Sequence, residues 1–306
     1  MEKFRLITRS DFDGLVCAVL LKHLELIDDI KFVHPKDMQD GLIKVTDKDI
    51  TTNLPFVDGV HLAFDHHHSE TIRNKEIKSN YIIDGEAPSA ARVVYNYYGG
   101  KDKFPAQWGE MMMAVDKADS AQFTQEDVLN PKGWELLSFL MDARTGLGRF
   151  KNFRISNYDL MMELIDHCKL HSIDEILELE DVKERVNLYL SHEEKFKEMI
   201  KRNAKVYGNV LVIDLLEETT IWSGNRFIQY ALFPETNISI QVIWGLNKQN
   251  TVLTAGKSIF NRSSDADIGE IMLKFGGGGH KNAGTCQIEN KKAYDILIQL
   301  VEKFKE

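Results

Sequence analysis

The sequence is poor in cysteine and in long apolar runs. Its three cysteines, Cys17, Cys168 and Cys286, are widely spaced and form no Cys-x-x-Cys pair, which argues against a disulfide framework and suits a reducing cytoplasm. The longest early apolar run, 16–21, is far too short to cross a membrane, and residues 1–4 do not open a signal peptide. We therefore expect a cytoplasmic protein without a membrane partner.

Basic residues are also too few to balance the acidic ones. The chain has 38 Lys and Arg against 47 Asp and Glu, for a formal net charge of −9. A protein that coats long duplex DNA usually carries a basic face, so this balance excludes long duplex DNA as a partner and favours short or small anionic substrates. With 306 residues, 43% hydrophobic and 28% charged, the chain is typical of a globular protein of two domains.

An acid and several histidines follow a short apolar run. Residues 60–64 (VHLAF) predict a buried strand, and Asp65, His66, His67 and His68 come directly after it. Ligands of α/β sheets bind at the carboxyl ends of strands. Histidine is a common metal ligand, and a neighbouring carboxylate often fixes its tautomer. A metal site and a polar loop that is merely rich in histidine both remain open at this point.

A second group of acids follows the first predicted strand. Residues 4–8 predict that strand and residues 15–26 a helix with apolar side chains at helical spacing. Between them, Asp11 and Asp13 are two residues apart, so in an extended turn both side chains point the same way. The alternative is an N-cap carboxylate. One cap needs one such residue, and Ser10 is also present, so we favour a functional role.

The rest of the N-terminal half alternates between short apolar runs and helical periodicity. We predict strands over 30–33, 50–53 and 81–84, and helices over 87–95 and 108–118. The last of these helices runs into Asp116 and Asp119, two further acids at a helix end.

A long charged helix separates this half from the remainder. It is predicted over 181–205, where apolar residues recur with a period of 3.6 and neither proline nor glycine occurs. Beyond it we predict strands over 210–213, 238–243, 251–254 and 283–288, and helices over 223–233, 265–275 and 291–304. We expect an α/β fold: a mainly parallel-sheet domain over 1–180, a linker helix over 181–205 and a smaller α/β domain over 206–306.

Four consecutive glycines, Gly276 to Gly279, close the helix predicted over 265–275 and precede His280 and Lys281. A helix C-cap needs only one glycine. Four let the backbone approach a ligand closely and present N–H groups to an anion. We therefore favour a clamp for phosphate over a simple cap.

The three motifs Asp11-Phe12-Asp13-Gly14, Asp65-His66-His67 and Gly276–His280 resemble, in their order and spacing, those of the DHH phosphoesterase family. The resemblance covers nearly the whole chain: a DHH catalytic domain, a linker helix and a DHH-associated substrate-binding domain. The family includes nanoRNases, phosphoadenosine phosphatases, RecJ-type exonucleases, exopolyphosphatases, type II pyrophosphatases and cyclic dinucleotide phosphodiesterases. The chain looks most like the two-domain branch that acts on oligonucleotides or small nucleotides.

The resemblance implies hydrolysis of phosphoester or phosphoanhydride bonds with Mn²⁺ or Mg²⁺. It assigns Asp13, His66 and Asp119 as metal ligands. Asp119 is chosen because residues 119–123 (DSAQF) parallel the family's Asp-Thr-Gly-x-Phe. It also makes Asp65 the orienter of His66. The remaining roles implied are a phosphate contact by His67 and substrate contacts by Arg262, Gly277, Gly278, Gly279 and His280, with Ser258 and Asn261 nearby.

The sequence departs from the family at the first of its two metals. Arg9 stands where the family has a histidine ligand, and arginine stays protonated and cannot bind a metal. The family's bridging Asp, at the end of the strand before the DHH strand, is best matched by Asn53, although Asp49 or Asp58 offers an alternative.

Charge decides how we interpret this departure. The family's first-metal ligands, His, Asp and Asp, sum to −2, whereas Arg9, Asp11 and Asn53 sum to zero. The Arg9 guanidinium then replaces the first metal as a fixed cation that pairs with Asp11 or a phosphate. We expect one principal Mn²⁺ (or Mg²⁺) ion rather than two.

Two functions remain open from these motifs. The first is a metal-dependent phosphoesterase acting on a short oligonucleotide, a nucleotide or polyphosphate. The second, suggested by the losses at Arg9 and Asn53, is a catalytically impaired sensor that binds such a ligand. A homodimer is compatible with either.

Overall fold

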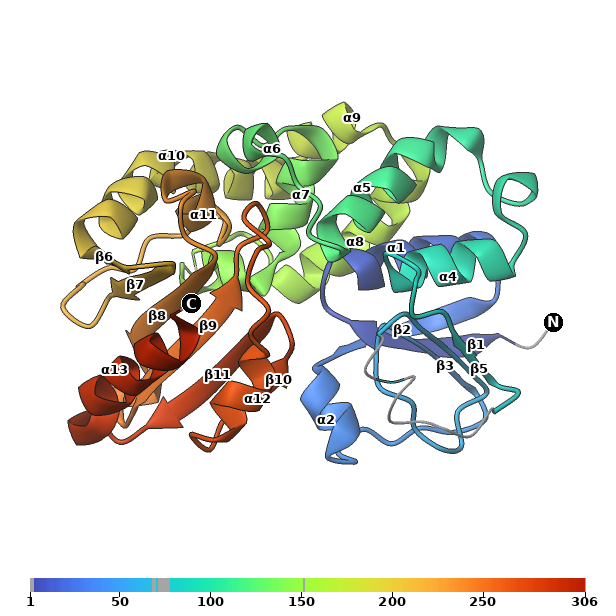
Figure 1. Ribbon diagram of the computed structural model, residues 1–306. Helices are drawn as coiled ribbons and strands as arrows, with labels where there is room; N and C mark the ends of the chain where they lie inside the picture. The colour runs from blue at the N-terminus through green and yellow to red at the C-terminus, as the bar shows by residue number, and fades with distance from the viewer. Residues whose placement is uncertain (1–2, 68–69, 71–77, 151, 306) are drawn as a thin grey trace. The chain divides into compact units, whose positions relative to one another are not determined.

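The structure, a computed structural model, describes residues 3–67, 70, 78–150 and 152–305 (Figure 1). His68 and Ser69, from the histidine-rich stretch, lie outside the described residues. The chain divides into two compact units, here called unit 1 (residues 1–122 and 131–188) and unit 2 (residues 123–130 and 189–306). Among the described residues, no helix combines the length and the apolar character that crossing a membrane requires.

Unit 1 is built on a five-stranded sheet in the order β2-β1-β3-β4-β5, and all of its pairs are parallel. Its strands are β1 (Phe4–Arg9), β2 (Ile27–Val33), β3 (Asp49–Thr52), β4 (Leu62–Asp65) and β5 (Tyr81–Ile83). Thr8 of β1 lies opposite Thr52 of β3, which lies opposite Phe64 of β4. The carboxyl ends of β1, β3 and β4 therefore meet at one edge. This confirms the predicted parallel sheet and α/β class.

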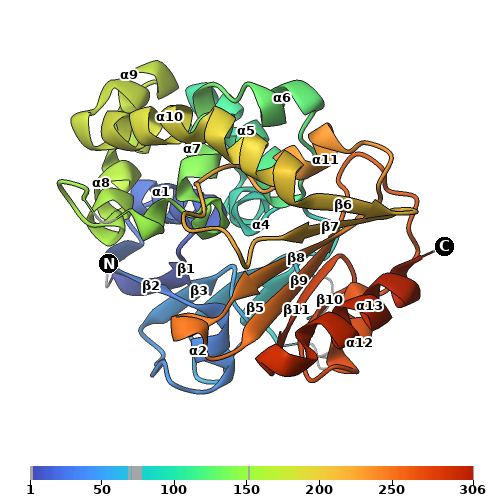
Figure 2. The same ribbon diagram turned by 90° about the vertical axis from the view of Figure 1, so that its left-hand side faces the viewer.

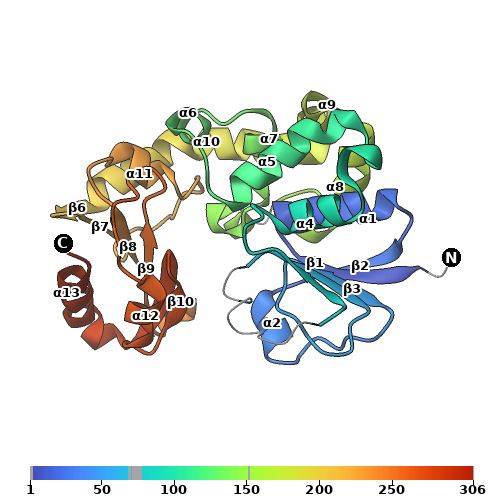
Figure 3. The same cartoon turned by 45° about the vertical axis from the view of Figure 1, so that its right-hand side comes forward.

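Helices cover both faces of this sheet. The α-helices of unit 1 include α1 (Phe12–His23), α2 (Pro35–Gln39), α4 (Ala90–Tyr97), α5 (Gly109–Asp119), α7 (Gly133–Met141), α8 (Asn157–Leu170) and α9 (Ile173–Glu178). Figures 1 and 3 show α1, α4 and α8 on one side and α2 on the other. Every α1 residue from Phe12 to Leu21 is buried, because α4, α5 and α8 all pack against it. A helix that is apolar all round belongs in such a core.

The first helix begins three residues earlier than predicted. Asp11 is its N-cap, with φ −150° and ψ −177°, and one of its carboxylate oxygens accepts the N–H of Gly14 at 3.0 Å. Asp13 already belongs to the first turn of α1. The expectation that both acids project from an extended turn was therefore wrong. The N-cap alternative holds for Asp11, because a side-chain oxygen there satisfies a free amide of the first turn.

Unit 2 carries a six-stranded sheet in the order β10-β11-β9-β8-β7-β6, in which only the pair β7–β8 is parallel. Its strands are β6 (Ala204–Tyr207), β7 (Val210–Asp214), β8 (Ile238–Trp244), β9 (Thr251–Lys257), β10 (Gly278–His280) and β11 (Ala283–Ile288). Its helices are α6 (Gln125–Leu129), α11 (Ile228–Leu232), α12 (Ile268–Leu273) and α13 (Ala293–Phe304). The edge strands β6 and β10 were not predicted.

The two faces of this sheet have different partners. Side chains of α12 and α13, including Met272 and Leu300, share an apolar core with Ile238 and Ile240 of β8. Figure 2 shows these two helices beside the sheet. On the opposite face, Ser239 of β8 accepts a hydrogen bond from Gln229 of α11 at 2.9 Å. The long helix predicted over 181–205 is present as α10 (Glu180–Asn203), which runs from unit 1 into unit 2.

Candidate active site

Asp13 is held by the N-terminus of another helix. The residue is 2% exposed, and its two carboxylate oxygens accept the backbone N–H groups of Ala90 at 3.0 Å and Ala91 at 2.8 Å. These amides open α4, whose dipole is positive at this end. The carboxylate is therefore fixed in position before any ligand binds.

Asp13, His66 and Asp119 converge on one point, and together they are called the metal cluster below. One ligand atom from each lies within 4.8 Å of the other two. Nε2 of His66 lies 2.9 Å from Asp119 and 4.0 Å from Asp13. On its other side, Nδ1 of His66 lies 3.3 Å from the carbonyl oxygen of Ala87. That contact fixes the tautomer with a lone pair on Nε2, as in histidines that bind metals.

The donor set of the metal cluster fits a divalent cation. Nε2 of His66 is buried and is not aligned for a hydrogen bond with any described residue, although Asp119 is close to it. Two carboxylates and one imidazole suit Mn²⁺, and the carboxylates also suit Mg²⁺. The structure therefore brings together the three residues that the resemblance assigns to the metal.

Burial and the close approach of two carboxylates and an imidazole shift the pKa values of all three residues of the metal cluster. Burial and the neighbouring charge of Asp119 raise the pKa of Asp13 to about 7. Burial alone would lower the pKa of His66, but Asp119 and Asp13 raise it to about 9. Burial opposes ionisation of Asp119 as well, yet the close approach and charge of the His66 ring lower its pKa. The net effect of burial and of the closeness of these charged groups therefore favours retention of a proton on Asp13 and on His66.

Asp65 orients a different histidine from the one expected. Its side chain is fully buried, and its carboxylate accepts from Nδ1 of His67 at 2.7 Å and from the Tyr81 hydroxyl at 2.9 Å. The carboxylate also accepts the backbone N–H of His66 at 2.8 Å. The assignment of Asp65 as the orienter of the His66 ring was therefore wrong. Burial lowers the pKa of His67, but the hydrogen bond to Asp65 outweighs it and the net change is upward.

Asp11 is fully engaged by donors of the protein itself. Nε of Arg9 lies 2.9 Å from its carboxylate, as expected for a fixed cation at this position. The side-chain amide of Asn53 donates to the same carboxylate at 3.2 Å, and Gly14 donates from its backbone. Burial raises the pKa of Asp11, and Arg9 offsets part of that change. Among the described residues, Asp11 does not belong to the metal cluster.

The three residues proposed for the bridging position differ in their distance from Asp11 and in their partners. Asp49 begins β3 and pairs with Arg5 at 2.7 Å, at the far end of the strand from the site. Asp58 is exposed and pairs with Lys78 at 2.5 Å. Only Asn53 reaches Asp11. Its φ of 54° is unusual for a residue other than glycine, and its Oδ1 is buried without a hydrogen-bond partner in the described residues.

Several groups that shape the site were not anticipated. They are the amides of Ala90 and Ala91, the carbonyl of Ala87, the hydroxyl of Tyr81 and the guanidinium of Arg144, whose charge acts on Asp11. A signal for the first two was present in the sequence, because Ser89 is an N-cap residue whose side chain accepts from Arg92. Nothing in sequence spacing indicates the others.

In unit 2, the glycine run serves the fold at two of its positions. The N–H of Gly277 donates to the carbonyl of Met272 at 3.0 Å, so it is not free for an anion, contrary to expectation. A Cβ at Gly277 would lie 2.2 Å from the Thr285 carbonyl oxygen, and one at Gly279 would lie 2.2 Å from that of Ala283. Gly278, Gly279 and His280 form β10 instead of a loop. Only glycine allows this close approach to β11.

The other candidates of unit 2 form a compact turn after β9. The hydroxyl of Ser258 is buried and accepts the backbone N–H of Asn261 at 3.0 Å. Asn261 donates from its side chain to the carbonyl of Glu235 at 3.3 Å. Arg262 donates from Nε to the carbonyl of Ile259 at 2.9 Å. Ser258 and Asn261 thus hold the turn that presents Arg262, which is exposed, as is His280.

No model of a known protein family matches the chain. A segment of 44 residues, 14% of the chain, is 43% identical to the A-adding tRNA nucleotidyltransferase of Aquifex aeolicus (strain VF5), and the match spans 5% of that curated relative. Among solved structures, RecJ of Thermus thermophilus, in complex with Mn²⁺, has a TM-score of 0.53 at 15% identity. That match covers 99% of this chain and 52% of RecJ, and at this identity it shows a shared fold alone.

A much stronger similarity covers both units. The pGpG-specific phosphodiesterase PggH from Vibrio cholerae is 62% identical, with a TM-score of 0.88, and the match covers 99% of each chain. PggH is a DHH-family enzyme. Such identity over the full length agrees with the motifs and with the geometry of the metal cluster. The chain therefore belongs to the DHH family of phosphoesterases and is a hydrolase.

Proposed function

We propose that the chain hydrolyses the phosphodiester bond of a short 5′-phosphorylated dinucleotide of the pGpG type, in a reaction that depends on a divalent metal. The observation that carries this proposal is the convergence of Asp13, His66 and Asp119 in a chain 62% identical to a pGpG-specific phosphodiesterase. The negative net charge of −9 also favours a small substrate over a long nucleic acid.

Asp13, His66 and Asp119 are the residues that would hold the ion, Mn²⁺ or Mg²⁺. When bound, the ion supplies an activated water and neutralises charge that develops on the phosphate. Asp13 is already anchored by the amides of α4, and His66 by the carbonyl of Ala87. The protein therefore loses little conformational freedom in forming the site.

His67 is assigned to the substrate phosphate. Asp65 accepts from Nδ1 of the ring, which leaves Nε2 as the donor toward an anion. The raised pKa of His67, caused by Asp65 against the opposing effect of burial, favours the protonated ring that a phosphate prefers. Arg9 supplies a second fixed positive charge beside Asp11.

The second phosphate and the nucleosides are assigned to unit 2. Arg262 and His280 are exposed, and they offer charged or polar donors without competing for the ion. Ser258, Asn261 and the strand formed by residues 278–280 fix the backbone that carries these two side chains. We retain Gly278 and Gly279 as backbone contacts to the substrate, and Gly277 as a support for them.

Hydrolysis by the intact purified chain tests the proposal. The substrates are pGpG, a longer oligoribonucleotide, phosphoadenosine phosphate and polyphosphate, each with Mn²⁺ and again with EDTA. We expect Mn²⁺-dependent release of guanosine monophosphate from pGpG, at a rate well above that of the other substrates. Asp119→Asn should abolish it, while Glu110→Gln, an exposed acid on the same helix, should not. Tight binding of pGpG without turnover would favour a sensor instead.

Replacing His280 separates the roles of the two units. We expect His280→Ala to raise KM for pGpG about tenfold, the loss of one hydrogen bond to a charged group, and to leave Mn²⁺ affinity unchanged. Calorimetric titration of Mn²⁺ and steady-state kinetics measure the two effects independently. An equal loss of metal affinity in this variant would identify His280 as a ligand and contradict the division proposed here.

A further inference from the structure

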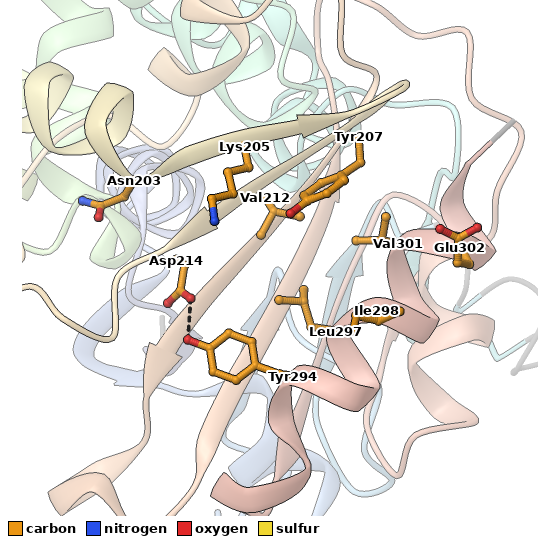
Figure 4. Close-up of a pocket in the computed structure, with 10 residues that line it drawn as sticks. All are labelled: Asn203, Lys205, Tyr207, Val212, Asp214, Tyr294, Leu297, Ile298, Val301 and Glu302. Atoms are coloured by element: carbon orange, nitrogen blue, oxygen red, sulfur yellow. Dashed lines mark hydrogen bonds between the residues drawn. The ribbon is translucent and has the colours of Figure 1, made fainter.

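A cavity of about 290 Å³ lies within unit 2, away from every residue assigned above. Its floor is the outer part of the sheet, with Lys205 and Tyr207 from β6 and Asp214 from β7 (Figure 4). Its wall is α13, which contributes Tyr294, Leu297 and Ile298. The cavity exists because β6, the edge strand, continues the sheet beyond the region that α13 covers.

The acids around this cavity already have partners. Asp214 accepts the hydroxyl of Tyr294 at 2.8 Å, drawn in Figure 4, and the backbone N–H of Leu216 at 3.1 Å. Glu302, at the rim, pairs with Lys305 at 2.5 Å. A cationic ligand would therefore have to compete with bonds that the protein already makes.

Two hydrogen-bond donors of the cavity, Lys205 and Tyr207, differ from the acids because their side chains lack such partners among the described residues. Neither the Lys205 side chain nor that of Tyr207 makes a hydrogen bond or an ion pair with any residue that the structure describes, and both are exposed. In Figure 4 both side chains extend from β6 over the cavity. An ammonium and a phenol without partners call for an acceptor, and the ammonium calls for an anion.

The rest of the lining is apolar and includes aromatic rings. Tyr294 is 54% exposed and Ile298 is 62% exposed on α13, while Leu297 and Val212 are buried beneath them. Exposed apolar side chains gathered at one place on a surface usually mark a binding site. Tyrosine faces and branched aliphatic side chains suit a flat ring.

We propose that this cavity binds a small molecule composed of one flat ring system and one anionic group, with the ring between Tyr207, Tyr294 and Ile298 and the anion on Lys205. The volume is at the lower end of the range for small-molecule sites, roughly 300–1,000 Å³, so the ligand has a single ring system. An aryl carboxylate and a nucleoside monophosphate share this chemistry. The site is independent of the proposed function, because it uses none of the residues of the metal cluster.

Calorimetric titration of the intact chain distinguishes the two sources. The probes are 4-hydroxybenzoate, its neutral amide, and guanosine 5′-monophosphate. We expect at least one of the two anions to bind. If 4-hydroxybenzoate binds, its neutral amide should bind at least tenfold more weakly. The source is identified by the anion whose binding Lys205→Gln weakens, because guanosine 5′-monophosphate is also the expected product of the active site.

Two substitutions locate that binding. Lys205→Gln should weaken it about tenfold, the loss of one charged hydrogen bond, and Ile298→Glu, an exposed position, should abolish it by repelling the anion. Lys303→Gln, which removes a charge elsewhere on α13, is the matched control and should change nothing. Absence of binding by both anions, or binding that Lys205→Gln leaves intact, would overturn the proposal. So would a stable dimer that Ile298→Glu dissociates, because a second copy would then occupy the cavity.

Discussion

The pairing of Arg9 with Asp11 gives the most decisive test of the metal site. Arg9 Nε lies 2.9 Å from the carboxylate, and the side chains are 34% and 20% exposed. We expect Arg9→His combined with Asn53→Asp to create a second metal site, because the local charge of residues 9, 11 and 53 changes from 0 to −2. Two carboxylates and a neutral imidazole are then available to a second ion.

The single change Arg9→Ala has the opposite consequence. It leaves the Asp11 carboxylate with only the amides of Asn53 and Gly14 as donors. Losing one partner of an exposed pair costs at most about 1 kcal/mol, and of a buried pair about 3–5 kcal/mol. The exposure of this pair lies between the two cases, so we expect about 2 kcal/mol. That corresponds to a lower midpoint of thermal unfolding by about 4–8 °C for a unit of this size.

Three measurements on four proteins decide the matter. Calorimetry with Mn²⁺ gives the number of ions bound by the wild type, Arg9→Ala, Arg9→Lys and the double variant. Thermal unfolding gives the stability of each. Hydrolysis of pGpG shows whether the added ion alters turnover. Arg9→Lys keeps the charge but not the planar guanidinium, so it should lose less stability than Arg9→Ala.

One combination of results would refute the reasoning. If the double variant still binds one ion, and if Arg9→Ala matches the wild type in stability and rate, then Arg9 does not occupy the place of a metal. Two ions bound by the wild type itself, less than about 4 Å apart as in two-metal sites, would refute it equally.

Three further predictions concern the acids of unit 1. Asp119→Asn should lower Mn²⁺ affinity by more than about tenfold in calorimetry, while Glu110→Gln on the same helix should not. Asp65→Asn should lower the free energy of unfolding by about 3 kcal/mol, because a fully buried carboxylate with several donors is lost. Tyr81→Phe, which removes one of those donors, should lower it by about 1–2 kcal/mol. Urea unfolding measures both variants, and equal losses would contradict this difference. Burial would raise the pKa of Asp49, but Arg5 and Thr46 lower it below the ordinary value of 3.8. The ionised Asp49 therefore stabilises the fold above that pH. Asp49→Asn should be less stable than the wild type at pH 7, and this difference in stability should vanish as the pH falls below 3.8. A pH-independent difference would show that the pair contributes by packing alone.

Sequence patterns were sufficient where a motif and a strand end coincide. Asp13 and His66 follow β1 and β4, whose carboxyl ends share one edge of the parallel sheet. Asp119, the last residue of helix α5, meets them there. Charge alone indicated that Arg9 pairs with Asp11 or with a phosphate, and the structure shows the pair with Asp11. Both inferences rest on the charge and the ligand chemistry of the residue types, which the sequence states directly.

Hydrogen-bond partners were harder to predict than proximity. Asp65 precedes both His66 and His67, and only the backbone path after β4 decides which ring it reaches. The pairing of β10 with β11 likewise depends on contacts between segments that no periodicity reveals. Strand β6 has mostly exposed residues and follows α10 directly, so it lacks the alternation that identifies a half-buried strand.

The segment 123–130 belongs to unit 2 although unit 1 resumes after it. Its Val128 is fully buried, and the Phe123 ring lies against that of Phe227, tilted by 47° with ring centroids 5.7 Å apart. A gene fragment that starts at residue 189 would therefore encode unit 2 with a hole in its core. By the same logic, a protease cut between residues 188 and 189 would leave two polypeptides that remain associated, because the first still contributes a helix to the fold of the second.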